Sequence, residues 1–245
     1  ALGILEEFGT IKNRIQLAER APDKTKDIWR KTGIMPRSID REIVEAMHRI
    51  HMGVDADYVN LLLHAMRTSL SDGWGGSMAA TECSDILFGT PTPLTSITNL
   101  ATLSRDKVNI VLHGHNPLLS QMIVNVAEEP DLKKMAEEKG AKGINLVGMC
   151  CTGNELLMRS GIPLAGSFFD QELAIATGAV EAMVVDYQCI YHSIPLTASC
   201  YHTKVITTST KGKISGTIYK EFRPENARDT AHEIIKLAIE NFPNR

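Results

Sequence analysis

The sequence lacks the long apolar segment that a membrane protein needs. Its longest apolar runs are as short as residues 108–112 and 182–185, far below the length that crosses a bilayer. No charged segment followed by an apolar one opens the chain, so no secretion signal is read there. We therefore expect a cytoplasmic, globular protein that has no membrane partner.

Basic patches and nucleotide-binding motifs are missing as well. The formal net charge is −3, and only 5% of the residues are aromatic. Because acidic and basic residues are interspersed, no positive footprint for nucleic acid is present. No G-x-G-x-x-G follows an apolar run, and there is no Walker-type loop, which disfavours a dinucleotide-binding dehydrogenase.

The cysteine content excludes a complete disulfide framework. There are five cysteines, an odd number, and the adjacent pair Cys150 and Cys151 is poorly placed to form a disulfide. Reduced thiols in a cytoplasmic protein are the better interpretation. Residues 2–8 read as the middle of a helix with no cap before it, so we expect a piece of a longer protein.

Residues 1–100 have the pattern of a helical domain portion. Ser38 is expected to cap one helix, and Asp55 is expected to cap the next. A glycine-rich turn over residues 72–76 separates these from a third helix that ends near Phe88. The segment 90–93, which contains two prolines, stops regular structure.

Residues 101–245 predict a Rossmann-like α/β domain. Short apolar runs alternate with segments of helical periodicity, which indicates a parallel sheet with helices on both faces. The expected strands are 108–112, 143–148, 182–185 and 204–208. The expected helical segments are 117–126, 154–159, 171–178 and 224–241. The predicted fold class is thus α/β, preceded by an α-helical segment.

Residues that bind soft metals follow three of the predicted strands. His113 and His115 follow the first strand, Cys150 and Cys151 the second, and Cys189 the third. In an open parallel sheet, functional groups gather beyond the carboxyl ends of the strands. Three successive strand ends with such a residue are improbable in a chain with five cysteines, so these residues are the candidate site.

The helix-start signals predict the same position for His115 and Cys151 relative to the helix that follows each of them. Asn116 and Pro117 predict an N-cap and first helical residue, and Thr152 to Glu155 fits a capping box. Each candidate would then lie one residue before a cap, where the helix dipole lowers a cysteine pKa. Imidazole and thiolates suit zinc, iron-sulfur or nickel. Either the remaining ligands lie elsewhere, or the site is mononuclear with an open position.

The remaining cysteines and histidines carry weaker signals. Cys83 and Cys200 are interpreted as small buried apolar residues, as Cys189 would be if it stood alone. His113 either orients His115 or bonds backbone. A glycine turn for close helix contacts is favoured over an anion site at residues 73–76. Surface or capping roles are expected for His48, His51 and His64.

Long runs of this sequence resemble the catalytic subunit of anaerobic nickel-iron carbon monoxide dehydrogenases. The runs that carry the resemblance are residues 72–78, 85–91, 113–117, 143–155 and 185–190. The resemblance implies that His115 and Cys151 bind the iron outside the cubane of the active-site cluster C. It implies that Cys189 binds an iron of the NiFe3S4 part, and that Cys150 is a neighbour which is not a ligand. His115 and Cys151 are thereby the catalytic candidates.

The resemblance also implies a reaction and partners for the whole enzyme. The reaction is CO + H2O giving CO2, two protons and two electrons, in either direction. The implied partners are a ferredoxin-type electron acceptor and a second copy in a homodimer, and an acetyl-CoA synthase subunit is left open. Further [4Fe-4S] clusters and the other cluster ligands would lie outside these residues, so the chain alone is expected to be inactive. The alternatives are a hybrid-cluster hydroxylamine reductase and a non-catalytic zinc-binding domain.

Overall fold

The computed structural model describes residue 18 and residues 20–245, and the chain divides into two compact units, Ala1–Thr90 and Pro91–Arg245. The boundary was predicted at residue 100. The helix expected over residues 2–8 lies outside the described residues. In the described part, no helix has the length and apolar character needed to cross a membrane.

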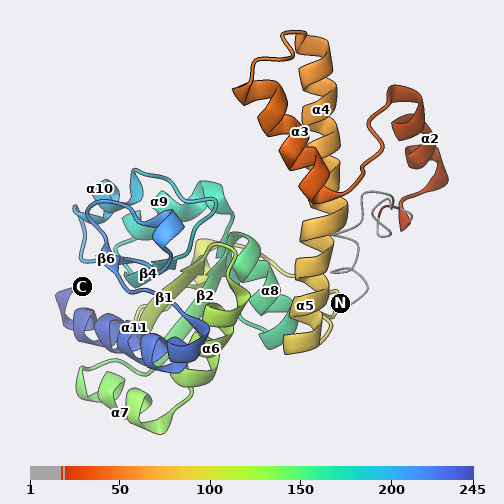
Figure 1. The fold of residues 1–245 in the computed structure, drawn as a ribbon. Coiled ribbons are helices and arrows are strands. Elements are labelled where there is room, and N and C mark those ends of the chain that lie inside the picture. The colour runs from red at the N-terminus through yellow and green to blue at the C-terminus, as the bar shows by residue number, and fades with distance from the viewer. Residues whose placement is uncertain (1–17, 19) are drawn as a thin grey trace. The chain divides into compact units, whose positions relative to one another are not determined.

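The first unit is helical. Its elements are α2 (Asp23–Thr32), α3 (Ile39–His51), α4 (Tyr58–Ser71) and α5 (Met78–Phe88). Figure 1 shows α4 running on into α5. A small core forms where Trp29 is buried and meets the ring of Trp74 edge to face, with 5.7 Å between ring centroids. Each of these helices also has exposed apolar side chains, including Ile28, Met47, Leu62 and Leu87.

Two local predictions in this unit are wrong. The glycine-rich segment is not a turn, because Asp72–Ser77 forms a π-helix that joins α4 to α5. The N-cap of α4 is Asp57, whose side chain accepts a hydrogen bond from the Val59 amide, whereas Asp55 accepts from the Asp57 amide at 3.0 Å. Ser38 occupies the N-cap position of α3 as predicted, but its side chain makes no capping hydrogen bond within the described residues.

The second unit is built on a six-stranded parallel sheet in the order β3-β2-β1-β4-β5-β6. The strands are β1 (Val108–His113), β2 (Ile144–Met149), β3 (Leu164–Gly166), β4 (Val180–Val185), β5 (Lys204–Thr207) and β6 (Ile218–Tyr219). The parallel α/β fold is confirmed. The edge strands β3 and β6 were not predicted, because three and two residues are too few to show a period.

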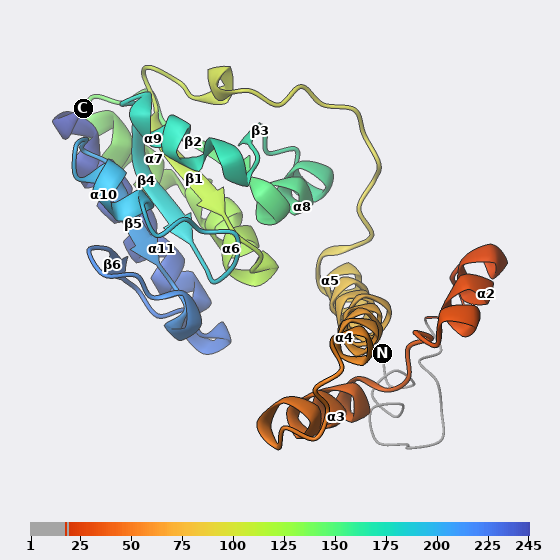
Figure 2. The same ribbon diagram turned by 90° about the horizontal axis from the view of Figure 1, so that it is seen from above.

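Helices cover both faces of this sheet. They are α6 (Pro117–Ala127), α7 (Pro130–Glu138), α8 (Cys150–Ser160), α9 (Gln171–Ala176), α10 (Ile194–Ala198) and α11 (Ala227–Asn241). Alternate residues of β1 divide between two cores. Ile110 and Leu112 pack with α6, α8 and α11, while Val111 packs with α9 and α10. Figures 1 and 2 show α6 and α11 on one side of the strands and α9 and α10 on the other.

The change of face sets the position of the site. The connections from β1 to β2 and from β2 to β3 pass through helices of one face, and those from β3 to β4 and from β4 to β5 pass through helices of the other. The strand order therefore reverses between β1 and β4. In doubly wound sheets, ligands bind beyond the carboxyl ends of the strands at this point.

Candidate metal centre

The predicted site residues follow three strands that are neighbours in the sheet. His115 follows β1 in the centre, Cys151 follows β2 on one side, and Cys189 follows β4 on the other. All three strands end at the same edge, because their pairing is parallel and in register up to His113, Met149 and Val185. The fold thus brings the three loops together at the switch point.

The chain turns sharply at two of these strand ends. Cys150 and Cys189 have φ values of 60° and 58°, and no other residue in the described part except glycine has a positive φ. A left-handed conformation costs a residue with a Cβ atom about 1–2 kcal/mol. The two strained residues lie where the loops that follow β2 and β4 leave the sheet.

The helix that carries Cys151 starts earlier than predicted. Helix α8 begins at Cys150, with Met149 as its N-cap, so Cys151 lies in the first turn and not before a cap. The predicted capping box is absent, since the Thr152 hydroxyl is buried and has no hydrogen-bond partner in the described part of the chain. The prediction is correct for α6, where the Asn116 side chain accepts from the amides of Leu118 and Leu119.

The thiols of the site lie close together. The Sγ atoms of Cys150 and Cys151 are 4.0 Å apart, and all five cysteines are free. Loss of solvent and then the neighbouring Cys150 thiol raise the pKa of Cys151 to about 11. The pKa of Cys189 is raised by the same two causes. The net pKa of Cys151 is therefore raised and not lowered as expected, and a bound metal cation would favour the thiolate.

Two histidines lie at the end of β1: His113 is the last residue of the strand, and His115 follows it. His113 is buried, and its Nε2 hydrogen bonds to the carbonyl oxygen of Cys189 at 2.8 Å. Burial lowers the pKa of His113. Nδ1 of His113 and Nδ1 of His115 are both buried, and neither bonds a group among the described residues. His113 thus holds the Cys189 loop through its Nε2 atom, and each histidine keeps a buried Nδ1 atom without a partner in the described part of the chain.

Two further residues hold the loops in place and were assigned no role from the sequence. Gln171 is fully buried; its Nε2 donates to the Cys189 carbonyl at 3.2 Å, and its Oε1 accepts from the Tyr191 amide at 3.0 Å. Asp186 accepts from the amides of His115 and Asn116. A charged residue directly after an apolar strand was the available signal for Asp186.

The donor set of the site is chemically suited to a soft metal centre. Imidazole and thiolates are ligands of zinc, nickel and iron-sulfur clusters, and the free His115 nitrogen is a buried polar atom that a metal would satisfy. Ligands of one tetrahedral zinc ion lie about 3–4 Å apart at the usual metal–ligand distances. Within the described residues, no three donors drawn from His115, Cys150, Cys151 and Cys189 lie within 4.8 Å of one another. The protein atoms in this arrangement do not form a three-ligand site for a single ion within the described residues.

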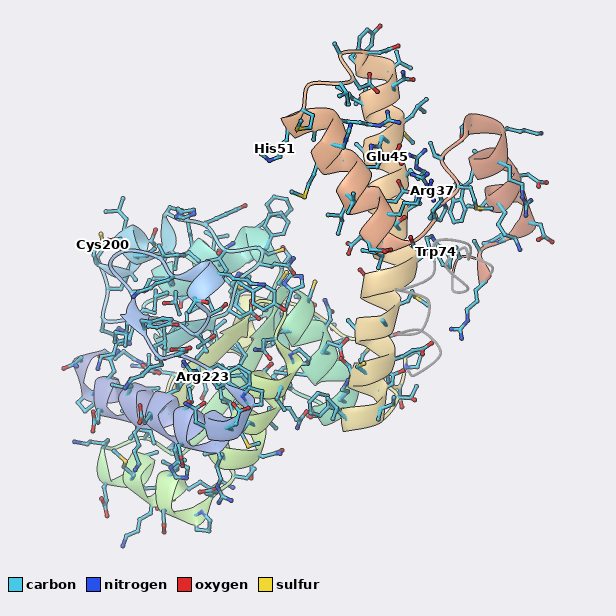
Figure 3. The ribbon with its side chains drawn as sticks, viewed as in Figure 1. Arg37, Glu45, His51, Trp74, Cys200 and Arg223 are labelled. Atoms are coloured by element: carbon cyan, nitrogen blue, oxygen red, sulfur yellow. The ribbon has the colours of Figure 1, made fainter. Side chains whose placement is uncertain are left out.

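A second group of possible ligands is a salt-bridge network. The donor atoms of Glu42, Glu45 and His64 lie within 4.8 Å of one another. The partners of these carboxylates are arginines, with Arg37 and Arg67 bonded to both glutamates. Figure 3 labels Arg37 and Glu45, one such pair. The arginines already supply the positive charge that a metal ion would bring.

Three predictions for isolated residues are wrong. His64 is not at the surface, because its ring is buried and its Nε2 lies 3.1 Å from Glu42. Cys83 and Cys200 are exposed, not buried. Cys200 is labelled in Figure 3, just beyond α10. His48 and His51 are exposed, as expected.

Known proteins resemble this chain over its whole length. The Prismane/CO dehydrogenase family matches residues 3–245. Carbon monoxide dehydrogenase 1 of Methanosarcina mazei is 58% identical over 245 residues, which are 100% of this chain and 39% of that protein. The carbon monoxide dehydrogenase/acetyl-CoA synthase subunit beta of Moorella thermoacetica is 48% identical over 98% of this chain and 36% of its own length.

Solved structures agree in fold. A Ni-free carbon monoxide dehydrogenase from Thermococcus sp. AM4 superposes with a TM-score of 0.89 and 57% identity, over 99% of this chain and 39% of that one. Carbon monoxide dehydrogenase IV from Carboxydothermus hydrogenoformans gives a TM-score of 0.88 and 46% identity, over 99% of this chain and 38% of that one. The chain therefore spans well under half the length of these relatives. By its sequence and its fold, it belongs to the Prismane/CO dehydrogenase family.

Proposed function

We propose that these residues form one wall of the active site of a nickel-iron carbon monoxide dehydrogenase. The observation that carries the proposal is the convergence of His115, Cys151 and Cys189 at the ends of three neighbouring strands, in a chain whose relatives named above are carbon monoxide dehydrogenases. The reaction is CO + H2O giving CO2, two protons and two electrons, in either direction.

The proposed ligands are His115, Cys151 and Cys189. When bound, the Ni-Fe-S cluster would supply nickel to take carbon monoxide and iron to activate water. His115 and Cys151 are assigned to the iron outside the cubane and Cys189 to an iron within it. The protein holds these side chains on loops that are fixed to one another by hydrogen bonds, so that the loops are ordered before any metal arrives.

The other parts of the proposal concern the longer protein. Further cluster ligands and [4Fe-4S] clusters lie in the share of the relatives' length that this chain does not span. The electron acceptor is of the ferredoxin type, the longer protein is a homodimer, and its location is the cytoplasm. An acetyl-CoA synthase subunit is a candidate partner, since the Moorella relative is a subunit of such a complex.

Metal analysis of the full-length protein tests this function. The protein is purified without oxygen, and nickel, iron and sulfide are measured together with CO oxidation by a low-potential dye. We expect nickel and iron with sulfide, and activity. Zinc alone would favour the non-catalytic alternative, and iron without nickel together with hydroxylamine reduction would favour a hybrid-cluster enzyme. The 245 residues by themselves are expected to show no CO oxidation, because only three ligands are present.

A further inference from the structure

Asp186 joins two of the loops that carry proposed ligands. It follows β4 directly, and it is 5% exposed. One carboxylate oxygen accepts the backbone amides of His115 and Asn116, which follow β1. The other accepts the amides of Tyr187 and Gln188 in its own loop. A single side chain therefore bonds to the backbone on both sides of the switch point.

These bonds are not needed to start helix α6. Asn116 is already the N-cap of that helix, and its side chain accepts from the amides of Leu118 and Leu119 at 3.1 and 3.3 Å. Asp186 binds the two amides that precede those, on the loop itself. Its effect thus falls on the position of His115 and not on the stability of the helix end.

The surrounding backbone is shaped around this carboxyl group. Gly114 has a φ of 128°, and a Cβ atom there would overlap the carboxyl group of Asp186. On the other side, a Cβ atom on Gly212 would lie 2.8 Å from the Cα atom of Tyr187 and would overlap the Asp186 carbonyl oxygen. Two glycines therefore allow the neighbouring loops to approach Asp186 closely, Gly114 at its carboxyl group and Gly212 at its backbone.

We propose that Asp186 is a positioning residue that sets the separation of His115 and Cys189 for the metal cluster. This inference rests on the proposed function, because it takes these two residues as ligands. Hydrogen-bonding groups behind metal ligands commonly change metal affinity or activity by about 10- to 100-fold when they are removed. Asp186 acts through the backbone, so it would serve whichever ligand atom His115 presents.

The substitution Asp186→Asn tests the inference in the full-length protein. An amide keeps one acceptor oxygen but places an NH2 group against the other pair of backbone amides, so one loop loses its acceptor. We expect at least about a tenfold loss of nickel content or of CO oxidation. We also expect changed g-values in the electron paramagnetic resonance spectrum and faster hydrogen exchange at the amides of His115 and Asn116.

Glu181→Gln is the matched control, because Glu181 is a fully buried carboxylate near the start of β4, at the other end of the strand that Asp186 follows. It is expected to leave the spectrum and the metal content unchanged. If Asp186→Asn has the spectrum and nickel content of the wild type, the inference is overturned. Equal losses in both variants would also overturn it, since the cause would be general destabilisation.

A third variant keeps the test decisive if Asp186→Asn does not fold. Asp186→Glu retains both acceptor oxygens but moves them by one methylene, so changed g-values support the positioning role and an unchanged spectrum with full nickel content overturns it. Metal analysis of the wild-type protein distinguishes a failure of the proposed function from a failure of the role proposed for Asp186. A wild-type protein without nickel and iron overturns the proposed function itself, whereas a metal-loaded wild type with an indifferent Asp186 overturns only the inference.

Discussion

The two ends of strand β4 carry buried carboxylates with opposite kinds of partner. Glu181, near the start of the strand, bonds the side chains of His202 at 3.0 Å and Arg245 at 2.7–2.9 Å, as well as the Asn109 amide. The hydrogen bonds that Asp186 accepts beyond the end of the strand come from backbone amides. The Glu181 carboxylate is thus paired mainly with side chains, whereas the Asp186 carboxylate binds backbone amides.

The difference shows what each edge of the sheet is built to do. At the amino edge the Glu181 carboxylate bonds the side chains of both His202 and Arg245. At the carboxyl edge the backbone is held while Nδ1 of His115 and the hydroxyl of Thr152 remain without partners in the described part of the chain. Paired charges thus lie at the amino edge, and buried polar atoms without partners lie at the carboxyl edge.

The largest expected effect removes a ligand at the carboxyl edge. Cys151→Ser in the full-length protein is expected to lower CO oxidation and nickel content by more than about 100-fold, beyond the usual effect of groups behind the ligands. Metal analysis and a dye-reduction assay measure it. Cys200→Ser, at an exposed thiol, is the control and should match the wild type. If both variants retain wild-type activity, Cys151 is not a ligand.

An intermediate effect is expected at the amino edge. Glu181→Gln leaves the Arg245 guanidinium without its counter-charge, which we expect to cost about 2 kcal/mol, less than a fully buried pair because Arg245 keeps some contact with water. Urea unfolding of the full-length protein, with hydrogen exchange at the start of β1 and β4, measures it. Glu233 forms an exposed ion pair with Lys220, and the substitution Glu233→Gln should lower the free energy of unfolding by less than about 0.5 kcal/mol. If the two variants lower the free energy of unfolding equally, the bonds of Glu181 to His202 and Arg245 contribute no more than an exposed ion pair.

The smallest effect concerns acid and the carboxylates of the helical unit. Burial raises the pKa of Glu42 and Glu45, but bonds to Arg37 and neighbouring arginines outweigh it, so the net pKa of each is lowered, for Glu45 to about 2. Because the folded pKa lies below the unfolded one, the stabilisation is complete above about pH 4.5 and is lost as the pH falls towards about 2.

Hydrogen exchange in α3 and α4 between pH 5 and pH 2.5 checks this dependence on acid. The wild-type protein should open locally as the pH falls, and Glu45→Gln should be less protected at pH 5 and change less across the range. A variant as sensitive to acid as the wild type would assign the dependence to other groups. Glu233→Gln, on the α/β unit, is again the control.

Local signals predicted those parts of the molecule that local structure determines. The Asn116 cap and the strands around His115 follow from a few consecutive residues, so the sequence is sufficient to predict them. Cys150 leaves β2 in a left-handed conformation and enters α8 at once, and propensity rules favour the later capping box instead. Burial at Cys83, Cys200 and His64 depends on neighbours distant in sequence, and these predictions were wrong. The bonds of Asp186 to His115 and Asn116, about 70 positions earlier, likewise depend on the tertiary fold and could not be predicted from local sequence.

The hydrogen bonds of Asp186 end on amides, and every residue type except proline offers an amide. The loop would therefore keep its shape if another side chain replaced His115, and substitutions at that position should report on metal chemistry without a change in folding. The same property makes the edge a place for redesign. A thiolate, a carboxylate or an imidazole could be exchanged at position 115 on an unchanged backbone, so that ligand type becomes a single independent variable.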